Sequence, residues 1–195
     1  DPISINPALK PHQRDVVRWA ILGGCRAIFA SFGLGKTAMQ LELARITGEH
    51  HEGLSLIVAP LGVKQEFTRD AQIVLGVTPP LYVRSTDEIK AAAANGVKSF
   101  ITNYERVRDG DFDLSLFQTA CLDEASVLRS NNTKTWHSFL AKFSVIPYRY
   151  VCTATPSPNN FIEIIQYAAF LGVMDIGQAK TRFFQRNSEK AGDLT

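Results

Sequence analysis

The stretch ASFGLGKT, residues 30–37, constrains the fold of this chain more than any other. An apolar run, RAIFA at 26–30, leads into it, and KTAMQLELARI at 36–46, with helical spacing of apolar residues, follows it. Glycines at 33 and 35 let backbone N–H groups face an anion without an intervening Cβ. Strand, glycine loop and helix in this order predict a phosphate-binding loop, although Ala30 stands where the common pattern G-x-x-x-x-G-K-[ST] has glycine.

The rest of the chain alternates short apolar runs with segments of helical periodicity. Further strands are expected at 54–60, 81–84, 98–102, 119–123 and 148–155. Helices are expected at 12–24, 36–46, 63–75, 85–96, 133–143 and 160–172. Such alternation predicts an α/β fold with a mostly parallel central sheet and helices on both faces. The 195 residues suit one domain with a sizeable core.

The side chains of the loop indicate a nucleotide with a metal ion. Lys36 can reach the β- and γ-phosphates of ATP, and the Thr37 hydroxyl can bind Mg²⁺. The helix that follows adds the positive end of its dipole. A chance glycine turn before a helix is the alternative interpretation. The nucleotide-binding residues predicted here are Phe32, Gly33, Leu34, Gly35, Lys36, Thr37 and Ala38.

A partner acid for the metal stands in CLDEAS, residues 121–126. An apolar strand places Asp123 at its carboxyl end, near the loop, where its carboxylate can bind Mg²⁺. Glu124 beside it can orient or deprotonate the attacking water. Taken alone, an acidic pair after an apolar run is more often a solvated strand end. Together with the loop, it predicts three catalytic residues, Lys36, Asp123 and Glu124.

These motifs together resemble the first RecA-like motor lobe of a superfamily 2 helicase or translocase, in its Swi/Snf-like branch. The loop pattern A-x-x-G-x-G-K-T occurs in that superfamily. LKPHQ at 9–13, VAPLGVKQEF at 58–67, ITNYERVR at 101–108 and TATPSPNN at 153–160 resemble its glutamine motif and motifs Ia, Ib and III, in that order. The resemblance implies a RecA-like P-loop three-layer sandwich. Two departures, Ala30 for an acidic residue and Ser126 for histidine, leave the subfamily open.

The resemblance assigns roles to residues outside the loop. Gln13 would read the adenine edge. Thr153, Ala154 and Thr155 would couple the nucleotide state to the rest of the motor, with the two hydroxyls bonding the Asp123–Glu124 segment. DNA, in duplex form and without sequence preference, would be contacted by loops at the carboxyl ends of the strands. The DNA-binding candidates are Pro60, Leu61, Gly62, Lys64, Thr102, Asn103, Tyr104 and Arg106.

Family members hold ATP between two lobes, and the second lobe supplies arginine fingers. We expect residues 1–176 to form lobe 1 and residues 177–195 to connect toward a second lobe. Asp1 is not a start methionine, so we expect a piece of a longer motor ATPase. Alone it should be nearly inactive, because a missing arginine finger costs roughly 10³–10⁵ in rate.

Composition narrows the alternatives without deciding among them. Lys and Arg number 21 and Asp and Glu 19, so any DNA site must be a local patch. No apolar run approaches the ~18 residues of a membrane span, and three cysteines without metal-ligand spacing suggest reduced thiols in the cytoplasm. An RNA helicase of the D-E-A-D class and a non-catalytic, nucleotide-gated binding module remain alternatives. The sequence DEAS argues against the first, and Glu124 argues against the second.

Overall fold

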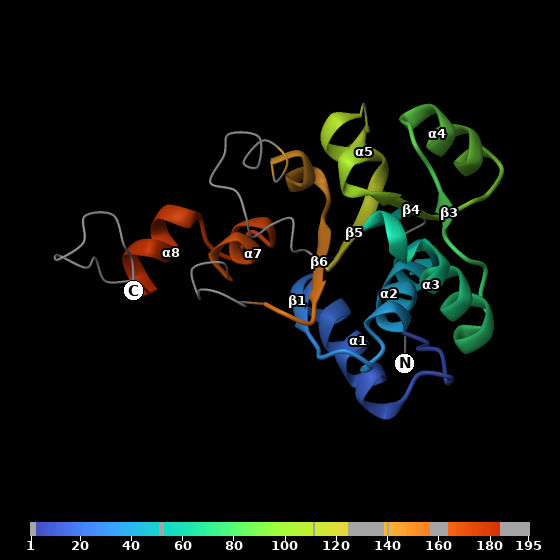
Figure 1. Ribbon diagram of the computed structural model, residues 1–195, viewed down its shortest axis with the longest axis horizontal. Helices are drawn as coiled ribbons and strands as arrows, with labels where there is room; N and C mark the ends of the chain where they lie inside the picture. The colour runs from blue at the N-terminus through green and yellow to red at the C-terminus, as the bar shows by residue number, and fades with distance from the viewer. Residues whose placement is uncertain are drawn as a thin grey trace.

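The computed structural model describes residues 3–50, 53–110, 112–124, 139, 141–156 and 164–183. Its centre is a six-stranded sheet in the order β1-β6-β5-β2-β4-β3, in which every neighbouring pair is parallel (Figure 1). The strands are β1 Cys25–Phe29, β2 Leu54–Ala59, β3 Leu81–Tyr82, β4 Ser99–Asn103, β5 Phe117–Asp123 and β6 Tyr148–Thr153.

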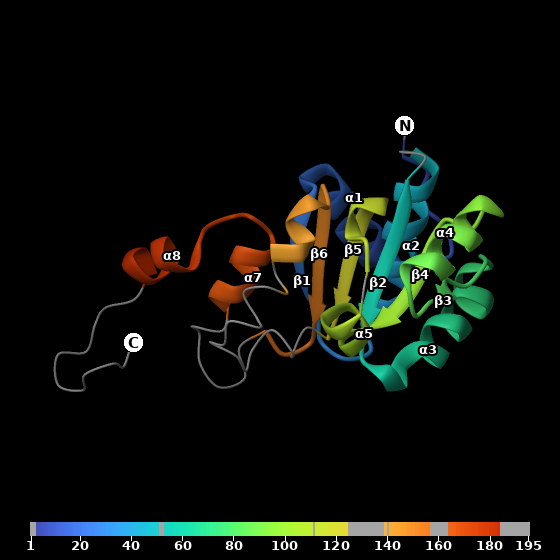
Figure 2. The same cartoon turned by 90° about the horizontal axis from the view of Figure 1, so that it is seen from above.

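Helices cover both faces of the sheet, and each face has its own apolar core. On one face, α1 Pro11–Gly23 and α2 Lys36–His50 lie behind the strands in Figure 2, and α3 Lys64–Arg69 packs on α2. On the other face lie α4 Thr86–Ala94, α5 Tyr104–Asp109 and α7 Ile164–Phe170. Parallel strands need such crossover helices, which is why the central strands are buried on both sides. The predicted α/β fold of three layers is confirmed.

Local sequence explains where several elements begin and end. Pro11 opens α1, where a missing N–H costs nothing, and Gln13 accepts the Lys10 N–H at 2.9 Å in a capping box. The Ser85 hydroxyl accepts the Glu88 N–H at 3.3 Å at the start of α4. Short 3-10 turns fill connections at Leu61–Val63 (η1), Leu114–Leu116 (η3) and Phe143–Val145 (η5).

Several expected elements differ from those of the structure. The helix expected at 63–75 divides into α3 and a π-helical segment, η2 Asp70–Leu75, which ends at Gly76 in the left-handed conformation. β3 has two residues, and β6 ends at Thr153 rather than at 155. The short helix α5 was not expected, because its six residues give no full apolar period. Residues 133–138, 140 and 160–163 of two expected helices lie outside the described residues.

The last described helix, α8 Ile176–Phe183, lies beyond α7, away from the sheet in both views (Figures 1 and 2). Ala179 is its one buried residue in the described part of the chain. The expected change from lobe to connector at residue 177 falls in the first turn of this helix. That domain boundary stays a prediction.

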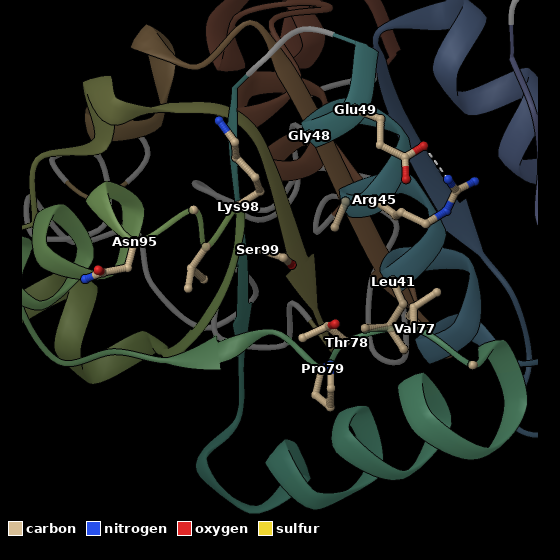
Figure 3. Close-up of a pocket in the computed structure, with 14 residues that line it drawn as sticks. Leu41, Arg45, Gly48, Glu49, Val77, Thr78, Pro79, Asn95, Lys98 and Ser99 are labelled. Carbon is tan, nitrogen blue, oxygen red and sulfur yellow. Dashed lines mark hydrogen bonds and ion pairs between the residues drawn. The ribbon is translucent and has the colours of Figure 1, made fainter.

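A hollow of about 580 Å³ lies at the amino ends of β2 and β4 (Figure 3). We call it the amino-edge hollow. It is lined by Leu41, Ala44, Arg45, Gly48, Glu49, residues 76–79 and residues 95–99. Arg45 pairs there with Glu49 and, through two hydrogen bonds of 2.9 and 2.7 Å, with the buried Glu42.

Candidate nucleotide-binding site

The loop between β1 and α2 has the backbone that its glycines predict. Gly33 and Gly35 have φ values of 80° and 79°, in the left-handed region that favours glycine. Nothing lies within 4 Å of the place where a Cβ on Gly33 would sit, so the loop is open on that side. Lys36 folds back over the loop, with Nζ 3.0 Å from the Ala30 carbonyl oxygen and 5.1 Å from the centre of the Phe32 ring.

Gln13 holds this loop from the side of α1. Its Nε2 donates to the Leu34 carbonyl at 3.0 Å, and its oxygen accepts the N–H of Lys10. A Cβ on Gly35 would come within 2.1 Å of that Nε2, so a larger residue there would displace the Gln13 amide, and the positive φ by itself favours glycine. The structure therefore gives Gln13 a role in loop geometry. Its predicted contact with adenine stays a prediction.

A cavity of about 540 Å³ opens beside the loop at the carboxyl ends of the strands. We call it the carboxyl-edge cavity. Of the residues predicted for nucleotide or catalysis it is lined by Phe32, Gly33, Gly35, Lys36, Thr37, Asp123 and Glu124. The remaining lining residues are Pro60, Val63, Glu66, Arg69 and Asp70. Pro60, expected to contact DNA, thus lies on the wall of the same cavity as the phosphate loop.

Asp123 ends β5 and is nearly enclosed, with 8% of its surface exposed. Gln40 Nε2 donates to its Oδ1 at 2.7 Å, and the Tyr104 hydroxyl donates to its backbone carbonyl at 2.8 Å. Burial raises the pKa of Asp123 to about 6, helped by the neighbouring charge of Glu124 and opposed by the Gln40 hydrogen bond. A carboxylate made costly to ionise in this way is poised to gain from a nearby cation.

Glu124 follows directly, with φ at 43°, the one non-glycine residue of the described chain with a positive φ. Two hydroxyls from the end of β6 hold its carboxylate. Thr153 Oγ1 donates to Glu124 Oε1 at 3.1 Å, and Thr155 Oγ1 donates to the same oxygen at 3.3 Å. The structure brings the two threonines to the acidic segment, with Ala154 between them. Their coupling role stays a prediction.

Glu66 is a residue of the cavity that sequence reasoning missed. It stands in the first turn of α3, and its Oε1 accepts a hydrogen bond of 2.9 Å from the Thr37 hydroxyl. The available signal was an acidic residue in the first turn of the helix that follows β2. Such a residue is ordinary at a helix start, so the pattern alone did not distinguish it.

The residues proposed for DNA divide by exposure. Thr102 is buried and donates to the Val83 carbonyl at 2.8 Å, and Tyr104 is buried against Phe139. Asn103 caps α5 by accepting the Arg106 N–H. The side chains of Thr102 and Tyr104 thus point into the protein, and the prediction that these two residues contact DNA stays a prediction. The exposed members are Leu61, Gly62, Lys64 and Arg106.

The fold and the sequence of this chain both match known proteins. The parallel sheet, with its loop and acidic strand end, is the α/β arrangement of RecA-like helicase cores. A sequence profile described as the SNF2-related domain matches residues 12–191, and the chain belongs to that family. The family and the fold together match the N-terminal, RecA-like lobe of Swi/Snf-like superfamily 2 proteins. No curated protein matched the chain in sequence.

Solved structures of low sequence identity share the fold. The SWI2/SNF2 ATPase core of Sulfolobus solfataricus, in complex with double-stranded DNA, is 20% identical with a TM-score of 0.73, covering 94% of this chain and 40% of that one. The UvsW helicase of bacteriophage T4 is 17% identical with a TM-score of 0.66, covering 83% of this chain and 57% of that one. The chain thus spans well under two thirds of the length of either.

Among the residues that the structure describes, none of the helices has the length and apolar character needed to cross a membrane.

Proposed function

We propose that this chain is the ATP-binding lobe of a DNA-dependent ATPase that couples ATP hydrolysis to movement on DNA. One observation carries the proposal. A single cavity at the carboxyl edge of the parallel sheet is lined by the lysine of the phosphate loop, by a hydroxyl that can bind a metal ion and by two adjacent carboxylates. These are the side chains of Lys36, Thr37, Asp123 and Glu124. Ligands of open α/β sheets bind at that edge.

The residues present fit ATP with Mg²⁺. No atom lies within 4 Å of the place where a Cβ on Gly33 would sit, so a phosphate can approach the backbone closely there. Lys36 Nζ now contacts two loop carbonyls, and an incoming phosphate oxygen would be a stronger, charged acceptor. Thr37 and Asp123 would hold Mg²⁺. The described residues contain no cluster of three or more His, Cys, Asp or Glu that could cage a metal, and Mg²⁺ commonly needs only one or two protein groups beside phosphates.

Each acidic residue has a separate task in this proposal. Asp123, ionised, attracts the metal, and the Gln40 hydrogen bond keeps its carboxylate oriented. Glu124 accepts a hydrogen bond from the attacking water, and Thr153 and Thr155 keep its carboxylate over the cavity. The bound Mg²⁺ neutralises phosphate charge during transfer.

Efficient turnover is proposed to need a second lobe. The chain spans 40% and 57% of the two solved chains described above, so each of those proteins has further segments outside the matched part. An arginine supplied from another lobe is worth roughly 10³–10⁵ in rate in related phosphoryl transfer.

The DNA face is proposed to be the exposed rim around η1 and α5. Lys64 and Arg106 are exposed cations there, and Leu61 and Gly62 offer exposed backbone at a turn. Cations and backbone N–H groups contact phosphates without reading bases, which suits binding to duplex DNA without sequence preference. The double-stranded DNA bound to the Sulfolobus relative supports the same choice of ligand.

ATP turnover with and without duplex DNA tests the proposal. The 195-residue chain should bind Mg·ADP in a manner that needs Lys36 and should show little turnover. In a chain extended by its second lobe, DNA should stimulate turnover, and Glu124→Gln should abolish it while ATP stays bound. Stimulation by RNA alone would favour an RNA helicase. Unchanged behaviour of Glu124→Gln would favour a non-catalytic binding module.

A further inference from the structure

The hydroxyl of Thr37, which has no carbonyl four residues earlier within α2, bonds to a side chain of another helix. Three other threonines in helices donate to a carbonyl four residues earlier in their own helix, namely Thr47, Thr68 and Thr181, at 2.8, 3.2 and 3.0 Å. This back-bonding is the usual choice in a helix. Thr37, in the first turn of α2, donates instead to Glu66 Oε1, a side chain 29 residues away on α3.

The position of Glu66 is fixed by its neighbour in the sequence. Phe67 is 1% exposed and belongs to the apolar core between α2 and the sheet, which anchors α3 at this point. Val63, one turn earlier, packs against the same core. Glu66 itself is exposed on the cavity wall, so its carboxylate lies between anchored backbone and open space. It is therefore held beside the phosphate loop by packing, with no need of a ligand.

A hydroxyl that binds a metal ion must orient both its lone pair and its proton. Its lone pair must point at the cation, and its proton must point elsewhere, at an acceptor. Thr37 is the second residue of α2, so the helix itself offers no carbonyl four residues earlier to take its proton. The Glu66 acceptor, which lies outside α2, therefore sets the rotation about the Cβ–Oγ bond. Groups beyond the direct metal ligands orient those ligands in this way.

We propose that Glu66 is a positioning residue for Mg²⁺-nucleotide binding, which accepts the Thr37 proton and so aims the hydroxyl lone pair at the metal. The inference rests on the proposed function, because it requires Thr37 to be a metal ligand. Glu66 acts through Thr37 and need not touch the nucleotide. It is a carboxylate from α3, outside both the phosphate loop and the acidic pair.

Calorimetric titration of ADP, in Mg²⁺ and in EDTA, tests this in the 195-residue chain. Glu66→Ala should weaken ADP binding in Mg²⁺ by about 10-fold, the lower end of the range for residues that orient metal ligands. In EDTA the same variant should bind ADP within roughly twofold of the wild type. Glu66→Gln keeps an acceptor oxygen and should retain most of the Mg²⁺-dependent affinity. Glu49→Gln, in the amino-edge hollow, is the matched control and should change neither value.

A double-mutant cycle with Thr37→Val separates positioning from other effects. Valine keeps the branched shape and removes the hydroxyl, so Glu66→Ala should cause no further loss in that background. A further loss of about 10-fold there would overturn the inference, as would equal weakening in Mg²⁺ and in EDTA. If the wild-type chain bound no nucleotide, or bound it without Lys36, the proposed function would fail as well. Normal Mg²⁺-dependent binding with no coupling between residues 37 and 66 would reject the positioning role alone.

Discussion

The two edges of the sheet carry hollows of similar size and opposite chemistry. The amino-edge hollow measures about 580 Å³ and the carboxyl-edge cavity about 540 Å³. At the amino edge, the charge of Arg45 is matched by Glu42 and Glu49, and a further hydrogen bond joins it to the Ser4 carbonyl at 2.7 Å. Volume therefore does not distinguish them. The carboxyl edge also holds an ion pair, between Arg69 and Asp70, but Lys36 and Asp123 form none among the described residues, and this distinguishes the two edges.

At the carboxyl edge the charges are arranged for a partner that the chain does not provide. Lys36 contacts neutral carbonyls instead of a carboxylate, and Asp123 lies buried beside a second acid. Neither group has the opposite charge that Arg45 has among the hydrogen bonds of the described residues. We therefore propose that a charged ligand balances the charges at the carboxyl edge, whereas the protein itself balances the charge of Arg45 at the amino edge. Four variants test this difference between the two edges.

The largest effect is expected at Lys36. Lys36→Ala should weaken Mg·ADP binding by roughly 100-fold or more, because a hydrogen bond to a charged group is worth about 1.5–3 kcal/mol and the ammonium can make more than one. Lys98→Ala, in the amino-edge hollow, should leave ADP affinity unchanged. Calorimetry on both variants measures the difference. Equal losses would remove the distinction between the two edges.

Arg45→Ala should have the opposite pattern. It leaves Glu42, which is 0% exposed, without its cation, and the free energy of unfolding should fall by about 3 kcal/mol. ADP affinity of the folded protein should not change. Urea unfolding followed by circular dichroism measures the loss. A variant as stable as the wild type, or one that has lost ADP binding, would contradict a purely structural role for this cluster.

Asp123→Asn should stabilise the chain while damaging its site. Burial raises the pKa of Asp123 to about 6 in the folded protein, above about 3.9 in an unfolded chain. Protonation of this group therefore favours the folded state below about pH 4, and that contribution is lost as the pH rises through about 6.

The asparagine variant removes the charge, so at about pH 8 its free energy of unfolding should exceed that of the wild type by on the order of 2 kcal/mol. The gap should close below about pH 4, where the wild-type carboxyl is protonated in both states. Urea unfolding at the two pH values measures it. A gap that is the same at both pH values would show that charge burial is not its cause.

Thr153→Val should have the smallest effect. The buried hydroxyl donates to Glu124 and accepts the Thr155 N–H, each at 3.1 Å, and the loss of both bonds should lower the free energy of unfolding by about 1 kcal/mol. Thr119→Val is a sharp control, because the buried Thr119 hydroxyl has no hydrogen-bond partner among the described residues. That change should be neutral or stabilising. If both variants lost the same stability, the hydrogen bonds of Thr153 to Glu124 and Thr155 would add nothing to the cost of deleting a buried hydroxyl.

The phosphate loop and the end of β5 could be predicted because short stretches of sequence specify them. The phosphate loop could be placed because glycines, lysine and threonine occur at fixed spacing between a strand and a helix. The end of β5 could be placed because an apolar run stops at Asp123. Both features are readable within ten residues, and the alternation of elements then predicted the parallel sheet.

What escaped prediction depends on contacts between distant segments. Tyr104 was expected to face DNA, yet its ring is buried and its hydroxyl is bonded to the Asp123 carbonyl 19 residues away. Glu66 looked like any acid at a helix start, and only the packing of Phe67 places it beside Thr37. The raised pKa of Asp123 likewise reflects burial, which a sequence of one chain does not reveal residue by residue.

The backbone at Glu124 has a consequence for substitution at this position. Its φ of 43° is a conformation that glycine adopts freely and that an L-residue adopts at a cost. A glycine at position 124 would relieve the backbone, but it would also delete the carboxylate that Thr153 and Thr155 hold. Glu124→Gly would therefore set two effects against each other, relief of the backbone at this position and loss of the carboxylate that we propose orients the attacking water.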